Sequence, residues 1–199
     1  FENMLDWLDE TIKLVEGNDK VFLIIREHPG ELLGQQKSRK TVTDLFSRRI
    51  KELDNVFLFK ASDGVNSYQL GEETDFAVVY GSKLTHELAA RGVPVIVAGD
   101  AWGRGKGFTY DPKNRLEYCN IVKKFFKQKI ELEEAMVEKA LIFCYEFYFK
   151  WAVEITSVKF SIKSGKTKMR RVDSNLLQST VDEGLVTVVR NILENKRFW

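Results

Sequence analysis

Four short apolar runs, separated by segments with helical periodicity, constrain the fold of this chain more than any other feature. The runs are rich in β-branched and aromatic side chains, which is typical of strands buried on both faces. They cover residues 21–25, 56–59, 75–80 and 93–97. Apolar residues recur every three or four positions at residues 5–15 and 42–50, and in the segment that ends at residue 91. This alternation predicts an α/β fold with a mostly parallel sheet and right-handed crossovers.

The pattern changes after about residue 100. Helical periodicity predicts helices at residues 113–127, 132–151 and 174–195, so we expect a Rossmann-like domain at residues 1–112 and a helical annex at residues 113–199. Residues 141–151 are aromatic on nearly every face, which predicts burial in the domain or against a neighbour. The basic residues 163–171 are interpreted as a solvated loop or, as an alternative, as a contact for an anionic partner. Doubly wound domains normally open with a strand, whereas the first element predicted in this chain is a helix. We therefore expect an upstream strand, or a whole preceding domain, before Phe1.

Composition excludes some classes of protein and leaves others open. With 199 residues and 44% hydrophobic side chains, the chain can bury a core. A formal net charge of +2 is too small to indicate a nucleic-acid partner. Cys119 and Cys144 lack metal-ligand spacing and are expected to be free thiols in a reducing compartment. No apolar run is long enough for a transmembrane segment.

Polar residues follow the first predicted strand at its carboxyl end. The sequence there reads Arg26-Glu27-His28-Pro29-Gly30-Glu31, and open α/β sheets bind ligands at this end of their strands. The segment is either half of a ligand site or an ordinary strand-to-loop turn with a solvated histidine.

Two further strand ends carry residues suited to phosphate. After the third strand, Gly81 and Ser82 open a helix whose free backbone N–H groups suit a phosphate. Glu87, in the first turns of that helix, could accept sugar or ribose hydroxyls or only complement the helix N-terminus. After the fourth strand, three glycines alternate with Arg104 and Lys106, so the loop could approach a diphosphate and present two cations. The alternative is a flexible surface loop.

Standard phosphate and hydrolase motifs are missing from the sequence. Phe160 stands where a Walker loop before Gly165-Lys166 would need glycine, and Phe108 stands where the dinucleotide fingerprint would need its third glycine. The chain has no Asp-x-Asp pair to hold a metal-bound nucleotide sugar. Ser82 lacks the glycine-flanked elbow of a Ser-His-Asp hydrolase.

Three segments together resemble bacterial capsule and surface polysaccharide biosynthesis proteins. They are Ile24 to Glu31, Glu87 to Gly99 and Arg104 to Pro112, and the resemblance covers about residues 3–112. The family is similar to capsular Kdo transferases and, more distantly, to sialyltransferases with a His-Pro motif. Those are GT-B glycosyltransferases, with two Rossmann-like domains and the donor nucleotide on the C-terminal one. The resemblance implies that this chain is such a donor-binding domain.

The resemblance also implies roles for individual residues. His28 and Ser82 would hold the donor phosphate with electrostatic support from Arg26, while Arg104 and Lys106 would neutralise the leaving phosphate without a metal or other cofactor. The expected nucleotide and phosphate contacts are Arg26, His28, Gly81, Ser82, Lys83, Thr85, Arg104, Gly105, Lys106 and Gly107. The expected ribose or sugar contacts are Glu87, Thr109 and Tyr110. Catalytic residues stay unassigned, with His28 and Glu31 as candidates.

We therefore expect a cytoplasmic glycosyltransferase that builds surface polysaccharide, with peripheral attachment to the inner face of the membrane left open. Its partners would be a nucleotide sugar, a glycan or glycolipid acceptor, and a missing N-terminal domain or partner subunit. One alternative is a sugar-nucleotide 2-epimerase, which shares the architecture. The other is a non-catalytic interaction module that docks a partner through the aromatic helix at residues 141–151.

Overall fold

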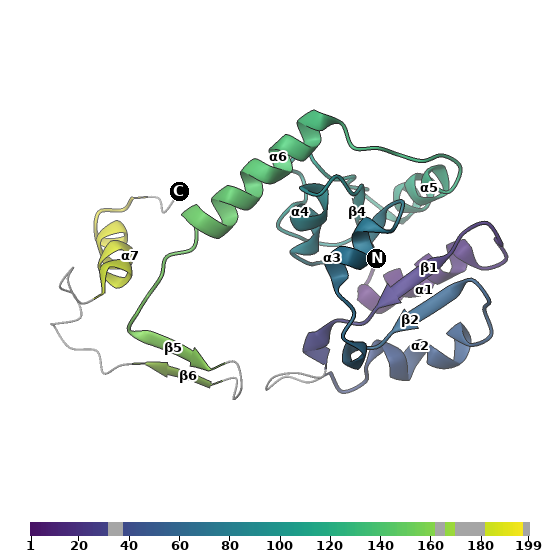
Figure 1. Ribbon diagram of the computed structural model, residues 1–199, viewed down its shortest axis with the longest axis horizontal. Helices are drawn as coiled ribbons and strands as arrows, with labels where there is room; N and C mark the ends of the chain where they lie inside the picture. Colours follow the sequence, from purple (N-terminus) through teal and green to yellow (C-terminus); the bar gives the residue numbers. More distant parts are fainter. Residues whose placement is uncertain (32–37, 162–165, 170–181, 197–199) are drawn as a thin grey trace. The chain divides into compact units, whose positions relative to one another are not determined.

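The chain divides into two compact units in the computed structural model (Figure 1). The first unit is Phe1–Cys144 and the second is Tyr145–Trp199. The structure describes residues 1–31, 38–161, 166–169 and 182–196. The helix expected at residues 113–127 belongs to the first unit, together with the four predicted strands.

The first unit has an α/β architecture, and all four predicted strands are present. They are β1 (Leu23–Arg26), β2 (Val56–Phe59), β3 (Ala77–Val79) and β4 (Val95–Val97). β1 pairs with β2 and β3 pairs with β4, both in parallel. Within the described residues the strands thus form two separate parallel pairs, whereas we expected one mostly parallel sheet.

Helices follow or precede each strand of the first unit, and polar side chains cap the start of several of them. The helices are α1 (Met4–Val15), α2 (Val42–Ile50), α3 (Ser67–Glu72), α4 (Leu84–Ala89), α5 (Arg115–Phe125) and α6 (Glu134–Tyr145). The side chains of Asn3, Thr41 and Asn114 accept backbone N–H groups from the first turns of α1, α2 and α5. Two short 3-10 turns, η1 (Pro29–Glu31) and η2 (Ala61–Asp63), follow β1 and β2.

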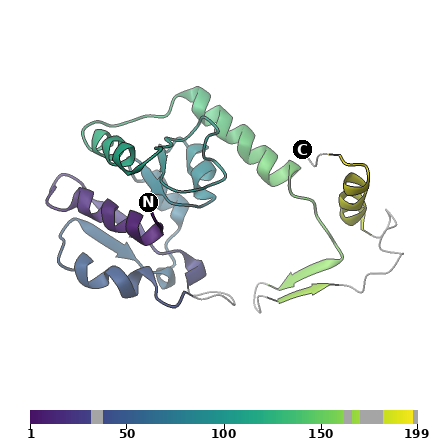
Figure 2. The ribbon, with the colours of Figure 1, turned by 180° about the vertical axis from the view of Figure 1, so that it is seen from behind.

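α1 lies between α2 and α5 on one side of the strands (Figure 2). Its apolar face, with Leu8, Ile12 and Val15, packs in one cluster with Ile25 of β1 and Val56 of β2. This spacing of three and four residues is the helical period that the sequence predicts for the segment.

Polar contacts also hold α1 to both neighbouring helices. The indole Nε1 of Trp7 donates to the hydroxyl of Tyr118 on α5 over 2.9 Å. Arg49 of α2 pairs with two carboxylates of α1, and Arg115 of α5 pairs with Asp6. α1 is therefore anchored to one helix on either side.

β4 is covered on both faces, as its continuous apolar sequence predicts. Val95 and Val97 pack in a cluster with Leu88 of α4, while Ile96 packs with Val122 of α5. Its second edge is occupied by the backbone of Tyr110, whose N–H donates to the carbonyl of Val95 and whose carbonyl accepts from Val97, each over 2.9 Å. α4 and α5 therefore lie on opposite faces of the β3–β4 pair.

The second unit contains strands where we expected only helix and loop. After α6 the chain continues as a π-helical turn (Glu146–Lys150), then as β5 (Val158–Ser161) and β6 (Lys166–Met169), which pair antiparallel. The expectation of a wholly helical annex is wrong, and so is the expected loop at residues 166–169. The rest of residues 163–171 lies outside the described residues. Val158 and Phe160 alternate with Lys159 and Ser161, which is the two-residue period of a strand.

One helix closes the described part of the second unit. α7 (Glu183–Leu193) falls inside the helix expected at residues 174–195, of which residues 174–181 lie outside the described residues. Asp182 caps it by accepting the N–H of Leu185 over 2.9 Å, and its other oxygen accepts the N–H of Ser157 over 2.7 Å. A hydrogen bond from the Ser157 side chain, together with those from the Leu185 and Ser157 backbone, lowers the pKa of Asp182 to about 2. Asp182 thus ties α7 to the segment that leads into β5.

The aromatic segment at residues 141–151 is not buried along its whole length. Leu141 and Ile142 of α6 are 54% and 56% exposed, so burial within the domain is the wrong expectation for them. Cys119 and Cys144 are free thiols.

Candidate functional site

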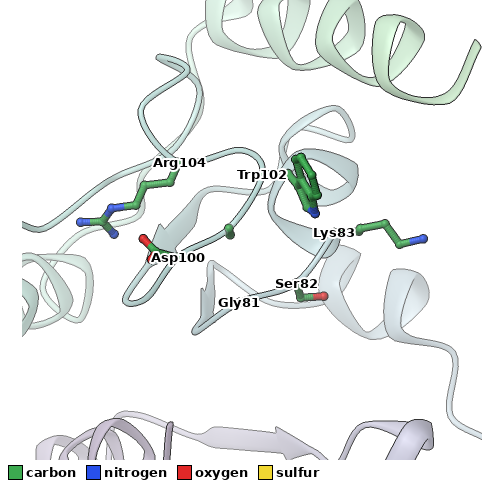
Figure 3. Close-up of a pocket in the computed structure, with 7 residues that line it drawn as sticks. Gly81, Ser82, Lys83, Asp100, Trp102 and Arg104 are labelled. Atoms are coloured by element: carbon green, nitrogen blue, oxygen red, sulfur yellow. The ribbon is translucent and has the colours of Figure 1, made fainter. Parts of the chain in front are cut away.

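The carboxyl ends of β3 and β4 meet at an open pocket of about 620 Å³ (Figure 3). Ligands of open α/β sheets bind at this end of the strands. The pocket is lined by Gly81, Ser82, Lys83, Asp100, Ala101, Trp102 and Arg104. Two of the three strand ends that we expected to converge are therefore together, and the β1 end does not line this pocket.

Two glycines allow the ends of β3 and β4 to approach each other closely. A Cβ atom added at Gly81 would lie 2.8 Å from the carbonyl oxygen of Asp100, and one added at Gly99 would lie 2.5 Å from the carbonyl oxygen of Tyr80. Both distances are shorter than real Cβ contacts, and the opposing atoms are backbone. The close approach of these two strand ends therefore requires glycine at both positions.

The backbone N–H groups of the first four residues of α4 already have acceptors within the chain. The N–H of Leu84 donates to Oγ of Ser82, and the N–H of Thr85 donates to the Ser82 carbonyl. The next two N–H groups donate to the carbonyl of Lys83. Gly81, Ser82 and Lys83 line this side of the pocket, and the side chains of Ser82 and Lys83 extend in the same direction (Figure 3).

Arg104 lines the pocket, but its guanidinium points away from Ser82 and Lys83 (Figure 3). Nη1 donates to the carbonyl oxygens of Val97 and Gly99, and Nη2 donates to that of Pro112. The arginine thus joins the end of β4 to the far end of the glycine-rich loop. Its hydrogen bonds hold the loop in place.

Asp111 organises the rest of the glycine-rich loop, and we did not predict this role. Its carboxylate accepts the N–H of Gly105 over 2.7 Å and the hydroxyl of Thr109 over 2.8 Å. Gly105 and Gly107 have positive φ angles of 72° and 82°, so the glycines are needed for the turn. Lys106 between them is exposed. The loop is a hydrogen-bonded turn that presents Lys106 to solvent.

Thr85, Glu87 and Tyr110, which we expected to contact phosphate or sugar, do not line this pocket. Thr85 is fully buried, and its hydroxyl donates to the carbonyl of Ser82 over 3.0 Å. The ring of Tyr110 packs edge-on against Phe125, and burial raises the pKa of Tyr110. Glu87 interacts with Tyr68 of α3, whose pKa is raised by burial and by the Glu87 carboxylate.

At the end of β1, polar side chains bind neighbouring backbone. The Arg26 guanidinium donates to the carbonyls of Val65 and Glu27. His28 is exposed, and its Nδ1 accepts the N–H of Gly30 over 2.9 Å, so the neutral ring carries its proton on Nε2.

Glu27 is the residue of this segment that sequence reasoning missed. It is 3% exposed, and its two oxygens accept the N–H groups of Thr43 (2.8 Å) and Ala61 (3.0 Å). Burial raises the pKa of Glu27, but these hydrogen bonds outweigh it and the net pKa is lowered. The two-residue period of β1 was the available signal, because Glu27 follows buried Ile25 on the same face.

Glu31, a candidate catalytic residue, also faces the start of α2. Its Oε2 accepts the N–H of Val42 over 3.1 Å. Burial raises the pKa of Glu31, and the nearby Glu27 charge adds to this effect. The β1 end is therefore an ordered turn that carries two carboxylates.

Among the described residues, no group of three or more metal-ligating side chains comes together. No helix in the described part of the chain is long and apolar enough to cross a membrane. Comparison with known proteins finds no matching protein-family model, no matching curated protein and no matching solved structure.

Proposed function

We propose that this chain binds a nucleotide sugar at the pocket between β3 and β4, as the donor-binding domain of a metal-independent glycosyltransferase that builds surface polysaccharide. One observation carries the proposal: the pocket at the carboxyl ends of these strands combines a hydroxyl from Ser82, an ammonium from Lys83 and the 61% exposed indole of Trp102. Phosphate, hydroxyl-rich sugar and aromatic base are the three parts of a nucleotide sugar.

Each group has a matching role in this proposal. Lys83 and Ser82 bind the phosphate, with Lys106 supplying further positive charge from the glycine-rich loop. Trp102 stacks on the base, and the Asp100 carboxylate accepts hydroxyl hydrogens of the ribose or sugar. In the transfer step, the bond between the sugar and the phosphate oxygen breaks, the oxygen of an acceptor hydroxyl forms the new glycosidic bond, and the hydroxyl proton passes to a base on the other GT-B domain. The cations then stabilise the charge on the leaving phosphate, and the acceptor site lies on the other GT-B domain.

Calorimetric titration of the chain with CMP, UDP, GDP and dTDP sugars tests the proposal. A hydrogen bond from a charged group contributes about 1.5–3 kcal/mol, so Lys83→Ala is expected to weaken binding by about 10- to 150-fold. Lys51→Ala, which removes an exposed lysine at the end of α2, is the matched control and should leave the affinity unchanged. The absence of saturable binding to all four donors would refute the proposal.

Trp102 tests the position of the base. Stacking of a base on an aromatic side chain contributes about 1–3 kcal/mol, so Trp102→Ala should weaken binding by about 5- to 150-fold, whereas Trp102→Phe should lose less. Equal affinities of the alanine variant and the parent protein would place the base elsewhere.

An interaction module is the second candidate, because Leu141 and Ile142 present exposed apolar side chains on α6. In that case Leu141→Ser and Ile142→Ser would abolish partner binding, while Lys83→Ala would have no effect. A sugar-nucleotide 2-epimerase would convert its substrate without any acceptor, which a transferase does not do.

A further inference from the structure

The two parallel strand pairs of the first unit each have an unused edge. Within the described residues, β1 pairs only with β2 and β3 only with β4, whose other edge is covered by Tyr110. The N–H of Leu23 donates toward β2, and that of Ala77 toward β4. Because successive residues of a strand bond to opposite sides, the backbone groups of Ile24 and Val78 point to the unused edges.

α1 places these edges in one layer. Its side chains pack with Ile25 and Val56 of the first pair, and Trp7 and Leu14 also join the cluster around Ile96 and Val78 of the second pair. A helix is about 10 Å across, and neighbouring strands lie about 4.8 Å apart. α1 is therefore wide enough to cover about two strand spacings, and β1 is the strand of its pair nearer β4 (Figure 1).

We propose that one more strand, in the polypeptide that leads into Phe1, inserts between β1 and β3 and runs parallel to both. The result is one five-stranded sheet in the order β2, β1, added strand, β3, β4. This proposal is independent of the ligand of the pocket. It assigns one occupant to two strand edges that have no strand partner among the described residues.

The direction of α1 supports this occupant. The end of α1 lies at the amino ends of β1 and β2, where Nδ2 of Asn55 contacts the carbonyl oxygens of Val15 and Asn18 at 2.9 Å. Its first turns lie at the carboxyl ends, where the Trp7 ring is 5.7 Å from that of Tyr80. A strand that leads directly into α1 would thus end at the carboxyl edge, parallel to its neighbours. α1 would then be its right-handed crossover to β1, as α2 is between β1 and β2.

The position of the added strand, between the edges of β1 and β3, predicts its sequence. A strand in the middle of a parallel sheet is covered on both faces, so it should be a run of about five apolar, largely β-branched residues. A short loop should separate it from the Asn3 cap of α1. Its carboxyl end would lie between the Arg26–Glu31 turn and Gly81, so this loop would join the two halves of the expected site.

Amide hydrogen exchange tests the proposal. The 199-residue chain is compared with a chain that carries the roughly 15 residues encoded before Phe1 in its gene, long enough for a strand and a loop. The Ile24 and Val78 amides should exchange about 100-fold more slowly in the longer chain. The Leu23 and Ala77 amides, which already donate to the carbonyls of Asn55 and Pro94, should change far less. Proline in the middle of the added strand is the matched control and should remove the protection, because proline cannot donate to a neighbouring strand.

Three results would overturn the proposal. The first is unchanged exchange at Ile24 and Val78 in the longer chain, and the second is a gene product that begins at Phe1. The third is protection in the 199-residue chain that rises with protein concentration, because this assigns the slot to a second copy. If the longer chain does not fold, the same residues are added as a synthetic peptide, and the exchange of the same two amides decides.

Discussion

Replacing Glu27 tests how the turn after β1 is held. Its carboxylate is 3% exposed and accepts two backbone N–H groups, from Thr43 and Ala61. In Glu27→Gln one amide oxygen can serve one of these donors, and the amide NH₂ then faces the other. An unsatisfied buried N–H costs about 1–3 kcal/mol, and the loss of charge from the remaining bond costs about 1 kcal/mol more. We expect Glu27→Gln to lower the free energy of unfolding by about 2–4 kcal/mol.

Urea unfolding, followed by NMR signals of the first unit, measures this loss. Glu31→Gln is the matched control, because Glu31 is half-buried and accepts one N–H, from Val42, which glutamine can still accept. Only the loss of charge near the start of α2 remains, so the control should change stability by less than about 1 kcal/mol. Equal losses in the two variants would refute the view that paired burial of two N–H donors distinguishes Glu27.

The pH dependence of the free energy of unfolding provides a second test of the role of Glu27. Burial by itself raises the pKa of Glu27, but the hydrogen bonds from Ala61 and Thr43 lower it below its ordinary value. A lowered carboxyl pKa stabilises the fold above the pKa of the unfolded chain, about 4.3, and this stabilisation is lost as the pH falls through the folded value. The difference between the parent protein and Glu27→Gln should therefore shrink in acid. A difference that grows below about pH 4 would show that burial dominates.

Three further changes test other parts of the structure. Gly99→Ala places a Cβ 2.5 Å from a backbone oxygen and should cost about 1–3 kcal/mol in urea unfolding, whereas Gly92→Ala, with φ of 82° but open space, should cost only about 1 kcal/mol. Burial raises the pKa of Tyr118 to about 12, so the free energy of unfolding should fall between about pH 10 and 12. In an absorbance titration, a tyrosine that ionises near pH 12 should be seen in the parent protein and be missing from Tyr118→Phe. Burial lowers the pKa of His86, so stability should fall as the pH drops through about 6.5, and His86→Phe should flatten that dependence in thermal melts from pH 7 to 5.

The strands of the first unit could be predicted because their residues are apolar in unbroken runs, and a strand buried on both faces needs such a run. Which strands are neighbours could not be predicted, because period and composition carry no information about partners. The β5–β6 hairpin was missed because a four-residue alternation such as Val158 to Ser161 is short beside the aromatic helix before it. The sequence pattern also does not predict which residues form the core of the second unit, where these strands lie.

The sequence predicts part of the lining of the pocket, but not the contacts that its side chains make. Gly81, Ser82 and Lys83 line the pocket at the end of a strand, where a parallel sheet places its loops. The role of Arg104 could not be predicted, because its donors reach the carbonyl of Pro112, eight residues later, and that contact depends on the path of the loop. A sequence shows that an arginine follows a strand, but it does not show whether backbone or ligand will accept its hydrogen bonds.

The contact between Trp7 and Tyr118 has a consequence for how the protein is made. The two residues are 111 positions apart, so the ribosome completes α1 long before α5 exists. At about 5–20 residues per second, the wait lasts about 5–20 s. During that time the side of α1 that faces α5 stays open to solvent on the nascent chain. A chaperone that binds apolar segments of the nascent chain should therefore raise the yield of folded protein. Slower synthesis between α1 and α5 should increase aggregation.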